Sequence, residues 1–228
     1  MLLWAPTLIA FMFLFFGPVF VLGLKIPPYL AFLIFLASLL GSYVNIPIAE
    51  VSSERPILSI ERVEVFGISW YVPRLSLAKQ KTLIVVNLGG AIIPTLVSLY
   101  LILFVSPLDP SPEISYLKIL IATTIVALIS KLNARVIPGF GIAAPALVAP
   151  LTASLASAFL FKAHSLSNPF VIAYVSGTLG TLIGADLLNL RKISKLGSAI
   201  VSIGGAGTFD GVYMAGVMAT TLTFLLAL

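Results

Sequence analysis

The sequence contains no cysteine and only one histidine, His164. Without cysteine the chain has no disulfides, no thiolate metal sites and no cysteine nucleophile. A zinc protease needs a His-Glu-x-x-His pair on one helix, and no such pair occurs in the sequence. His164 falls in an expected loop, outside the apolar segments where a Ser–His pair would have to lie. The sequence therefore predicts neither a bound metal nor a cofactor.

Charge is also scarce, because only 9% of the 228 residues are charged while 60% are hydrophobic. A soluble domain of this size cannot bury so much apolar surface, so lipid is expected to cover much of it. The net charge of +5 arises from Lys and Arg in short connectors beside apolar runs. The expected partner is therefore the lipid bilayer, and nucleic acid is excluded.

Apolar runs long enough to cross a bilayer recur along the chain. A spanning helix needs about 20 apolar residues for a hydrocarbon core of about 30 Å. No cleavable leader precedes the first run, which we interpret as a permanent span. The pattern predicts an all-α polytopic membrane protein, a single integral membrane domain over residues 1–228. Its seven expected spans are 2–24, 28–48, 82–105, 115–132, 138–161, 169–190 and 211–228.

The distribution of basic residues predicts the orientation of these spans. Ten Lys and Arg residues fall in the connectors on one side and three on the other. Because Lys and Arg concentrate on the cytoplasmic side, the N-terminus is expected in the cytoplasm and the C-terminus outside. The ten are Arg55, Arg62, Arg74, Lys79, Lys81, Lys131, Arg135, Arg191, Lys192 and Lys195, and the three are Lys25, Lys118 and Lys162.

The connector 49–81 is the only sizeable polar segment. Residues 57–66 are rich in Ile and Val, and Gly67 separates them from Ile-Ser-Trp-Tyr-Val. This pattern predicts a cytoplasmic β-hairpin at 57–73, between helices two and three. Because an isolated hairpin is marginal in water, we expect it to lie against the membrane, anchored by Trp70 and Tyr71. A purely structural loop is the alternative.

Two aspartates stand in apolar, glycine-rich sequence: Asp186 in Gly-Thr-Leu-Ile-Gly-Ala-Asp-Leu-Leu and Asp210 in Gly-Gly-Ala-Gly-Thr-Phe-Asp-Gly. A charged group at membrane depth costs about 2.5–3.5 kcal/mol on insertion scales, which makes each a functional candidate. The expected topology puts both near the cytoplasmic face. A neighbouring pair of carboxyls shares a proton and can activate water against a peptide carbonyl.

Structural roles remain open for the same residues. Asp210 could cap the last helix, and Asp186 could pair with Arg191 at the interface. Gly177, Gly180 and Gly184 form a small-residue face suited to close helix packing. Asn45 and Asn87 are expected in the same cytoplasmic third as the aspartates. Together with them they would also suit a proton or cation pathway, or simply hydrogen-bond between helices.

Three long motifs resemble the prokaryotic membrane family known as domain of unknown function 1614, whose name carries no activity. They are Asn-Leu-Gly-Gly-Ala-Ile-Ile-Pro, Gly-Thr-Leu-Ile-Gly-Ala-Asp-Leu-Leu-Asn-Leu and Gly-Gly-Ala-Gly-Thr-Phe-Asp-Gly. Ile183-Gly184-Ala185-Asp186 also resembles the Gly-x-Gly-Asp motif of the presenilin and signal-peptide-peptidase proteases, without its first glycine. Pro145-Ala146-Leu147 is similar to their Pro-Ala-Leu motif, but precedes the aspartates instead of following them.

The sequence thus favours an intramembrane aspartyl protease that cleaves a transmembrane helical peptide. Asp186 and Asp210 are the expected catalytic pair. The expected substrate-binding residues are Gly184, Gly205, Gly207, Asn87 and Asn45, with Pro145 added by the protease resemblance. The hairpin at 57–73 could add a strand to an unwound substrate. Two alternatives are a small proton- or cation-coupled transporter or channel using the same acids, and a non-catalytic membrane scaffold.

Overall fold

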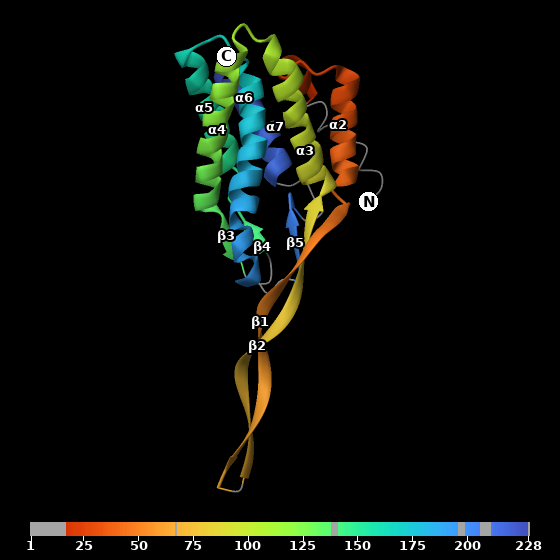
Figure 1. The fold of residues 1–228 in the computed structure, drawn as a ribbon, viewed down its shortest axis with the longest axis vertical. Helices are drawn as coiled ribbons and strands as arrows, with labels where there is room; N and C mark the ends of the chain where they lie inside the picture. The colour runs from red at the N-terminus through yellow and green to blue at the C-terminus, as the bar shows by residue number, and fades with distance from the viewer. Residues whose placement is uncertain (1–16, 67, 138–140, 196–198, 206–210, 228) are drawn as a thin grey trace.

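The computed structural model of the protein describes residues 17–66, 68–137, 141–195, 199–205 and 211–227. It consists of a helical body from which a long β-hairpin projects along the longest axis of the molecule (Figure 1). The principal helices of the body are α2 (Pro28–Gly41), α3 (Ile93–Tyr100), α4 (Pro112–Asn133), α5 (Val148–Ala163), α6 (Pro169–Thr181) and α7 (Gly211–Ala227). Short π-helical or 3-10 segments extend several of them: η1 (Val19–Gly23), η2 (Leu88–Ile92), η3 (Leu101–Val105), η4 (Ser106–Leu108), η5 (Leu182–Asp186) and η6 (Leu187–Lys195).

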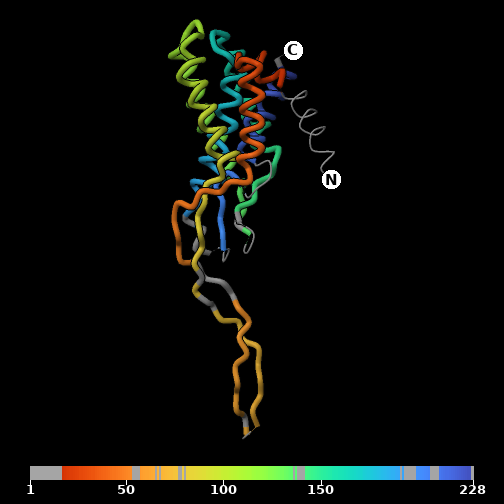
Figure 2. Tube along the Cα trace, turned by 90° about the vertical axis from the view of Figure 1, so that its right-hand side faces the viewer, coloured from red at the N-terminus to blue at the C-terminus, as the bar shows by residue number. Residues whose placement is uncertain are grey.

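The strands form two sheets at the end of the body from which the hairpin projects, and the larger sheet includes the hairpin itself. Strand β1 (Asn45–Val65) pairs antiparallel with β2 (Ile68–Asn87) along their whole length, and β5 (Ile200–Ile203) pairs parallel with the base of β2. The strand order is β1-β2-β5. Strands β3 (Arg135–Ile137) and β4 (Gly141–Ala143) form a separate antiparallel pair. At about 3.3 Å per residue, strands of this length extend about 65 Å. The hairpin also projects from the helical body in the second view (Figure 2).

Helix α6 occupies the centre of the helical body. Most of its residues are buried, and Tyr174 packs edge-on against Phe20 at a ring distance of 5.7 Å. Its glycines permit close neighbours: a Cβ on Gly177 would lie 2.8 Å from Ala215 O of α7, and one on Gly180 2.6 Å from Val126 Cβ of α4. The small-residue face of the sequence therefore packs helices, as such faces do in membrane proteins.

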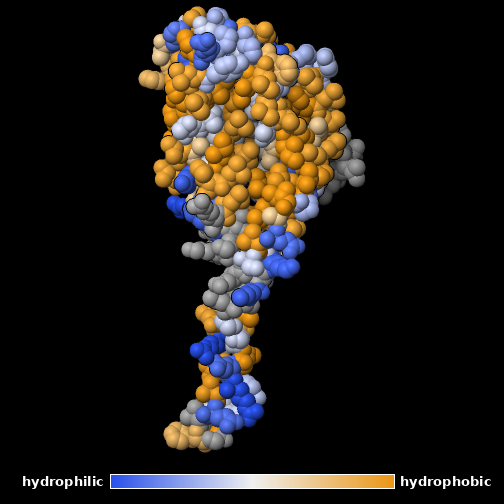
Figure 3. All heavy atoms as spheres, in the orientation of Figure 1, coloured by the Kyte–Doolittle hydropathy of each residue, from blue (hydrophilic) through white to orange (hydrophobic). Residues whose placement is uncertain are grey.

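Much of the face of the helical body seen in Figure 3 is apolar. Three helical stretches are long and apolar enough to cross a membrane: Leu88–Leu108, Pro112–Asn133 and Pro169–Leu190. Three shorter apolar helices accompany them, at Pro28–Gly41, Val148–Ala163 and Gly211–Leu226. These features are compatible with a membrane protein.

The expectation of an all-α fold with seven spans was wrong. In the second expected span, 28–48, the helix ends at Gly41, and β1 begins at Asn45. In the third, 82–105, the first six residues are the last six residues of β2. The described part of the fifth, 138–161, begins with strand β4 and is helical only from Val148. β-branched residues such as Ile84, Val85 and Val86 favour strands, and here they pair with β1 and β5. Residues 1–16 of the first expected span lie outside the described residues.

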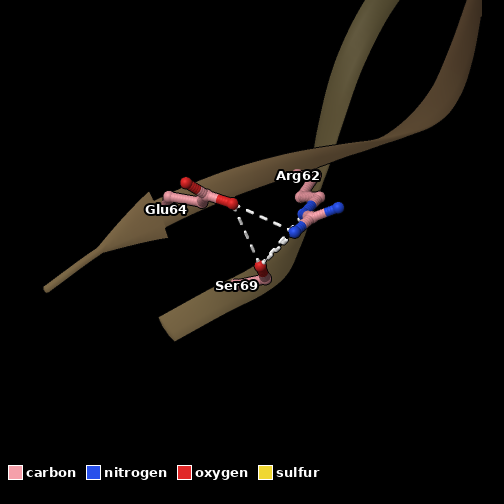
Figure 4. A network of polar contacts seen from close by, with 3 residues as sticks. All are labelled: Arg62, Glu64 and Ser69. Atoms are coloured by element: carbon pink, nitrogen blue, oxygen red, sulfur yellow. Dashed lines mark hydrogen bonds and ion pairs between the residues drawn. The ribbon is translucent and has the colours of Figure 1, made fainter. Parts of the chain in front are cut away.

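The expected placement of the hairpin also differs from the structure. Its strands run well beyond 57–73, and it projects away from the helical body instead of folding back along it (Figure 1). Trp70 and Tyr71 are 57% and 71% exposed near its tip, so neither packs against the body. Near the turn, Arg62 bridges Glu64 and Ser69 in an exposed polar network (Figure 4).

Candidate active site

Asp186 ends the π-helical segment η5, at the end of the helical body where the sheet begins. Its Oδ2 accepts a hydrogen bond of 2.9 Å from the backbone N–H of Gly204, the residue directly after β5. Two carbonyls of the same turn, Gly184 O and Ala185 O, accept from the buried Asn189 side chain at 3.1 and 2.9 Å. The carboxylate is thus held by the backbone of the loop after β5, on a turn fixed by Asn189.

The loop after β5 has a backbone that only glycine adopts readily. Gly204 and Gly205 have φ values of +78° and +87°, in a region that costs little for glycine. A Cβ on Gly204 would lie 2.7 Å from the backbone nitrogen of Ala91 in η2. The two glycines therefore let the chain turn sharply and approach η2 at van der Waals distance.

A small apolar cluster positions this loop. Val201 and Ile203 of β5 are buried with Ile84 of β2 and Ala91 of η2. Leu182 of η5 packs against the same cluster. Residues of β5, η2 and η5 thus pack in the same apolar cluster. This packing brings Asp186, at the end of η5, close to the end of β5, where the helices meet the sheet.

Asn45, Asn87 and the β5 loop form one hydrogen-bonded network beside this junction. Asn87 is 1% exposed, and its amide donates to Ser42 O at 2.7 Å and to Asn45 Oδ1 at 3.1 Å. Its own oxygen accepts from Gly90 N at 2.7 Å and so caps η2. The Ser202 hydroxyl lies within donating distance of two acceptors, Asn45 Oδ1 at 3.0 Å and Gly205 O, and shares its single proton between them. These bonds join the start of β1, the end of β2 and the loop next to Asp186.

Gly184 and Pro145 have different surroundings. A Cβ on Gly184 would lie 2.8 Å from Ala127 Cα of α4, so this glycine serves helix packing. Pro145 lines a small cavity of about 40 Å³ together with Ser130, Thr181 and Gly211. Gly211 opens α7 and directly follows Asp210 in the chain. Pro145 therefore lies beside the start of α7, where the second aspartate of the sequence is attached.

Asp210 and Gly207 lie outside the described residues, so the distance between the two aspartates and the capping role considered for Asp210 stay predictions. In the sequence, Asp210 directly precedes Gly211, the first residue of α7. Helices α6 and α7 pack side by side through Gly177 and Ala215. The described start of α7 therefore belongs to a neighbour of the helix that carries Asp186.

Three residues of this site were not singled out from the sequence. Gly204 supplies the N–H for Asp186, Ser202 bridges to Asn45, and Asn189 fixes the turn. A signal existed for each. Gly204-Gly205 and Ser202 interrupt an apolar run, and Asn189 stands three residues after Asp186 in an otherwise apolar segment. A polar residue in such a setting is usually kept for a specific hydrogen bond.

A second polar cluster lies among the loops that join the helices at the opposite end of the body. Asp109 Oδ2 accepts from Ser115 Oγ at 2.7 Å and from Asn168 N at 3.1 Å. The buried Lys118 donates to His164 O and to Ser167 Oγ, the latter at 2.8 Å. His164 contributes its carbonyl here, so the cluster ties loops together and supplies no nucleophile–base pair.

Within the described ranges, no three His, Asp or Glu side chains come together in a way that could hold a metal ion. Asn45 and Asn87 use their amides to bind backbone groups and each other. This arrangement accounts for the two asparagines as structural residues between helices and sheet.

Comparison with known proteins gives one match. The model of a family described as Protein of unknown function (DUF1614) matches residues 39–222, which include Asp186, Asp210 and the whole hairpin. No curated protein and no solved structure matches the chain. The resemblance to presenilin and signal-peptide peptidase therefore finds no support in these comparisons.

Proposed function

We propose that this chain, which belongs to the DUF1614 family, is an intramembrane aspartyl protease whose catalytic pair is Asp186 and Asp210. One observation carries the proposal. The carboxylate of Asp186 is hydrogen-bonded to the backbone immediately after β5, a strand at the edge of its sheet. A carboxylate at the end of an edge strand lies where an added substrate strand would present its peptide bonds.

The edge of β5 suits a substrate that must unwind. In the order β1-β2-β5, β5 has a strand on only one side within the described part of the chain. A transmembrane helix that is opened for cleavage exposes backbone groups, which must find partners inside the membrane. Pairing with a strand edge provides those partners. The substrate backbone would then run past Gly204 and Asp186.

An apolar groove offers a route for a helical substrate. It has a volume of about 360 Å³ and lies between α2 and α3, lined by apolar side chains that include Leu33, Ile34, Leu96 and Val97. At its α2 side, Ala37 is followed by Ser38, whose hydroxyl donates to Gly89 O at 2.5 Å. The groove therefore runs toward the junction that holds Asn87 and the β5 loop.

The two carboxyls divide the chemistry as follows. Asp186 takes a proton from a water molecule, whose oxygen attacks the carbonyl carbon of the scissile peptide bond. Protonated Asp210 gives its proton to the carbonyl oxygen. The tetrahedral intermediate then collapses, the C–N bond breaks, and the amine leaves with a proton from the pair. A carboxylate accepts about four hydrogen bonds, so the bond from Gly204 is compatible with a bound water.

The test is cleavage of a transmembrane helical fusion protein co-reconstituted with the full chain in liposomes, with cleavage sites mapped by mass spectrometry. Asp186→Asn and Asp210→Asn should each abolish cleavage within the transmembrane segment. Asp109→Asn is the control, because Asp109 is hydrogen-bonded in the cluster at the far end of the helical body. If cleavage persists in both site variants, the proposal is wrong. If both variants instead remove a proton or cation flux, the acids serve transport.

A further inference from the structure

The projecting hairpin has two open edges. β5 covers the outer edge of β2 only over Leu83–Val86, and β1 has β2 as its only neighbouring strand in the described chain. An isolated two-stranded hairpin is marginally stable in water, and a long open edge is a template for pairing with another chain. A hairpin extending about 65 Å therefore needs a partner along most of its length.

The open edge of β2 continues the edge that β5 already uses. The N–H of Leu83 donates outward to Ala199 O at 2.9 Å. Because N–H groups alternate between the two sides of a strand in such a ladder, those of Lys81, Lys79, Leu77 and Leu75 also point outward. Pro73, the next residue in this series, has no N–H and bounds the run. Four consecutive outward donors are thus available to one more strand.

The two strands carry opposite charge. β1 contains Glu50, Glu54, Glu61 and Glu64 against Arg55 and Arg62, which gives a net charge of −2, whereas β2 contains Arg74, Lys79, Lys81 and no acid, which gives +3. Inside the hairpin these charges already pair, with Lys81–Glu50 at 3.1 Å and Arg74–Glu61 at 2.7 Å. The hydrogen bond and charge of Glu61 raise the pKa of the Arg74 guanidinium. A second β1 beside β2 would repeat this acid–base alternation.

The hairpin also exposes apolar side chains that water disfavours. Leu58, Ile60 and Leu75 are each more than 70% exposed. Nearer the turn, an open groove of about 370 Å³ is lined by Val63, Phe66, Ile68, Trp70 and Val72. Exposed apolar patches of this kind mark interaction surfaces. A partner along the hairpin would cover them.

We propose that this partner is a second copy of the chain. Copies inserted in one membrane share one orientation, so they are related by rotation about the membrane normal. That rotation can place β1 of one copy beside β2 of the next. Because β1 runs away from the membrane and β2 runs back toward it, the two strands are antiparallel. Contacts between β1 and β1, or β2 and β2, would bring like charges together. Head-to-tail contacts of this type close into rings, here of three or more copies.

The ring leaves the candidate active site intact. The neighbouring β1 pairs with β2 between Pro73 and Leu83, and β5 keeps the base of β2. The β5 edge, where a substrate strand is proposed, stays open. The assembly is independent of protease activity, so the two proposals can fail separately.

Cross-linking tests the strand pairing directly, because the native chain has no cysteine. Ile57 and Ser76 lie at the same level of the hairpin, since they pair with each other within one chain. One tagged copy carries Ile57→Cys and a differently tagged copy carries Ser76→Cys, both as full chains in membranes treated with a short bismaleimide. A product carrying both tags is expected. Two copies with Ile57→Cys should give several-fold less. Equal yields, or no product, would overturn the proposal.

A charge swap provides a second readout with the hairpin's internal pairs preserved. The variant Glu50→Lys/Glu54→Lys/Lys79→Glu/Lys81→Glu reverses the sign of the net charge on both strands. It exchanges the charges at two pairs of opposing positions, 50 with 81 and 54 with 79, so the ion pair between residues 50 and 81 is kept. Swapped copies should assemble with one another, and native copies with one another, whereas native and swapped copies should co-purify several-fold less. Monomers of native chain in nanodiscs, or equal co-purification of native with swapped copies, would contradict the ring.

Discussion

Ser202 Oγ donates a 3.0 Å hydrogen bond to Asn45 Oδ1, although 157 residues separate the two in the chain. Ser202 belongs to β5, directly before the loop that holds Asp186, and Asn45 is the first residue of the hairpin. The bond couples the candidate site to the base of the hairpin. Displacing either strand would therefore disturb the loop that positions the carboxylate.

Gly204→Ala should destabilise the fold and displace the loop from Asp186. The alanine would have to keep a φ of +78°, and its Cβ would lie 2.7 Å from the backbone nitrogen of Ala91. Strain of this kind costs about 1–3 kcal/mol, to be measured as a loss of unfolding free energy in detergent. The matched control is Gly211→Ala, whose Cβ would meet no atom of the described residues within 4 Å. Equal stability of the two variants would show that the close approach to Ala91 is absent.

Asn87→Leu should lower the free energy of unfolding by about 1–3 kcal/mol. The backbone groups that Asn87 binds would stay buried without a hydrogen-bond partner, and such groups are costly. The change removes the partners of Ser42 O and Gly90 N, both at 2.7 Å. Asn133→Leu is the comparison, since that amide binds only Ile129 O of its own helix turn among the described contacts. Chemical denaturation in a defined detergent measures both, and a smaller loss for Asn87→Leu would contradict the role given to the network.

Reporters should place the hairpin and the C-terminus on opposite sides of the membrane. Helix α7 begins near the sheet at Gly211 and ends at the far end of the helical body, where the C-terminus lies (Figure 1). The excess of Lys and Arg in the hairpin and its neighbouring connectors predicts that this end is cytoplasmic. A reporter after Leu228 should be active outside and one inserted after Ser53 inside. Activity of both on one side would refute this arrangement.

The sequence predicted local features better than it predicted the sheet. The Ile- and Val-rich segment before Gly67 indicated a hairpin, and the spacing of Gly177, Gly180 and Gly184 indicated close helix packing. Both signals are carried by neighbouring residues in the chain. Asn45, Asn87 and Asp186 were expected at one end only through the seven-span topology, which was wrong, whereas in the structure the hairpin base and β5 bring them there.

The strands at the base of the hairpin and strand β5 could not be predicted from such local signals. Leu83 to Val86 and Ile200 to Ile203 are short apolar runs, and such runs are as compatible with a membrane helix as with a buried strand. What decides between them is their mutual pairing, a contact between distant parts of the chain. Periodicity within either segment carries no information about it. For the same reason the Gly204–Asp186 bond was not foreseen.

The parallel pairing of β5 with β2 also fixes an order of events during synthesis. The partner of Leu83–Val86 is Ile200–Ile203, which leaves the ribosome only after α4, α5 and α6 have been made. Contacts between distant segments form slowly because the intervening loop must close first. The edge of β2 at the base of the hairpin consequently stays unpaired until most of the chain has been synthesised. A nascent chain truncated before residue 200 would therefore expose this edge as a template for pairing with another chain.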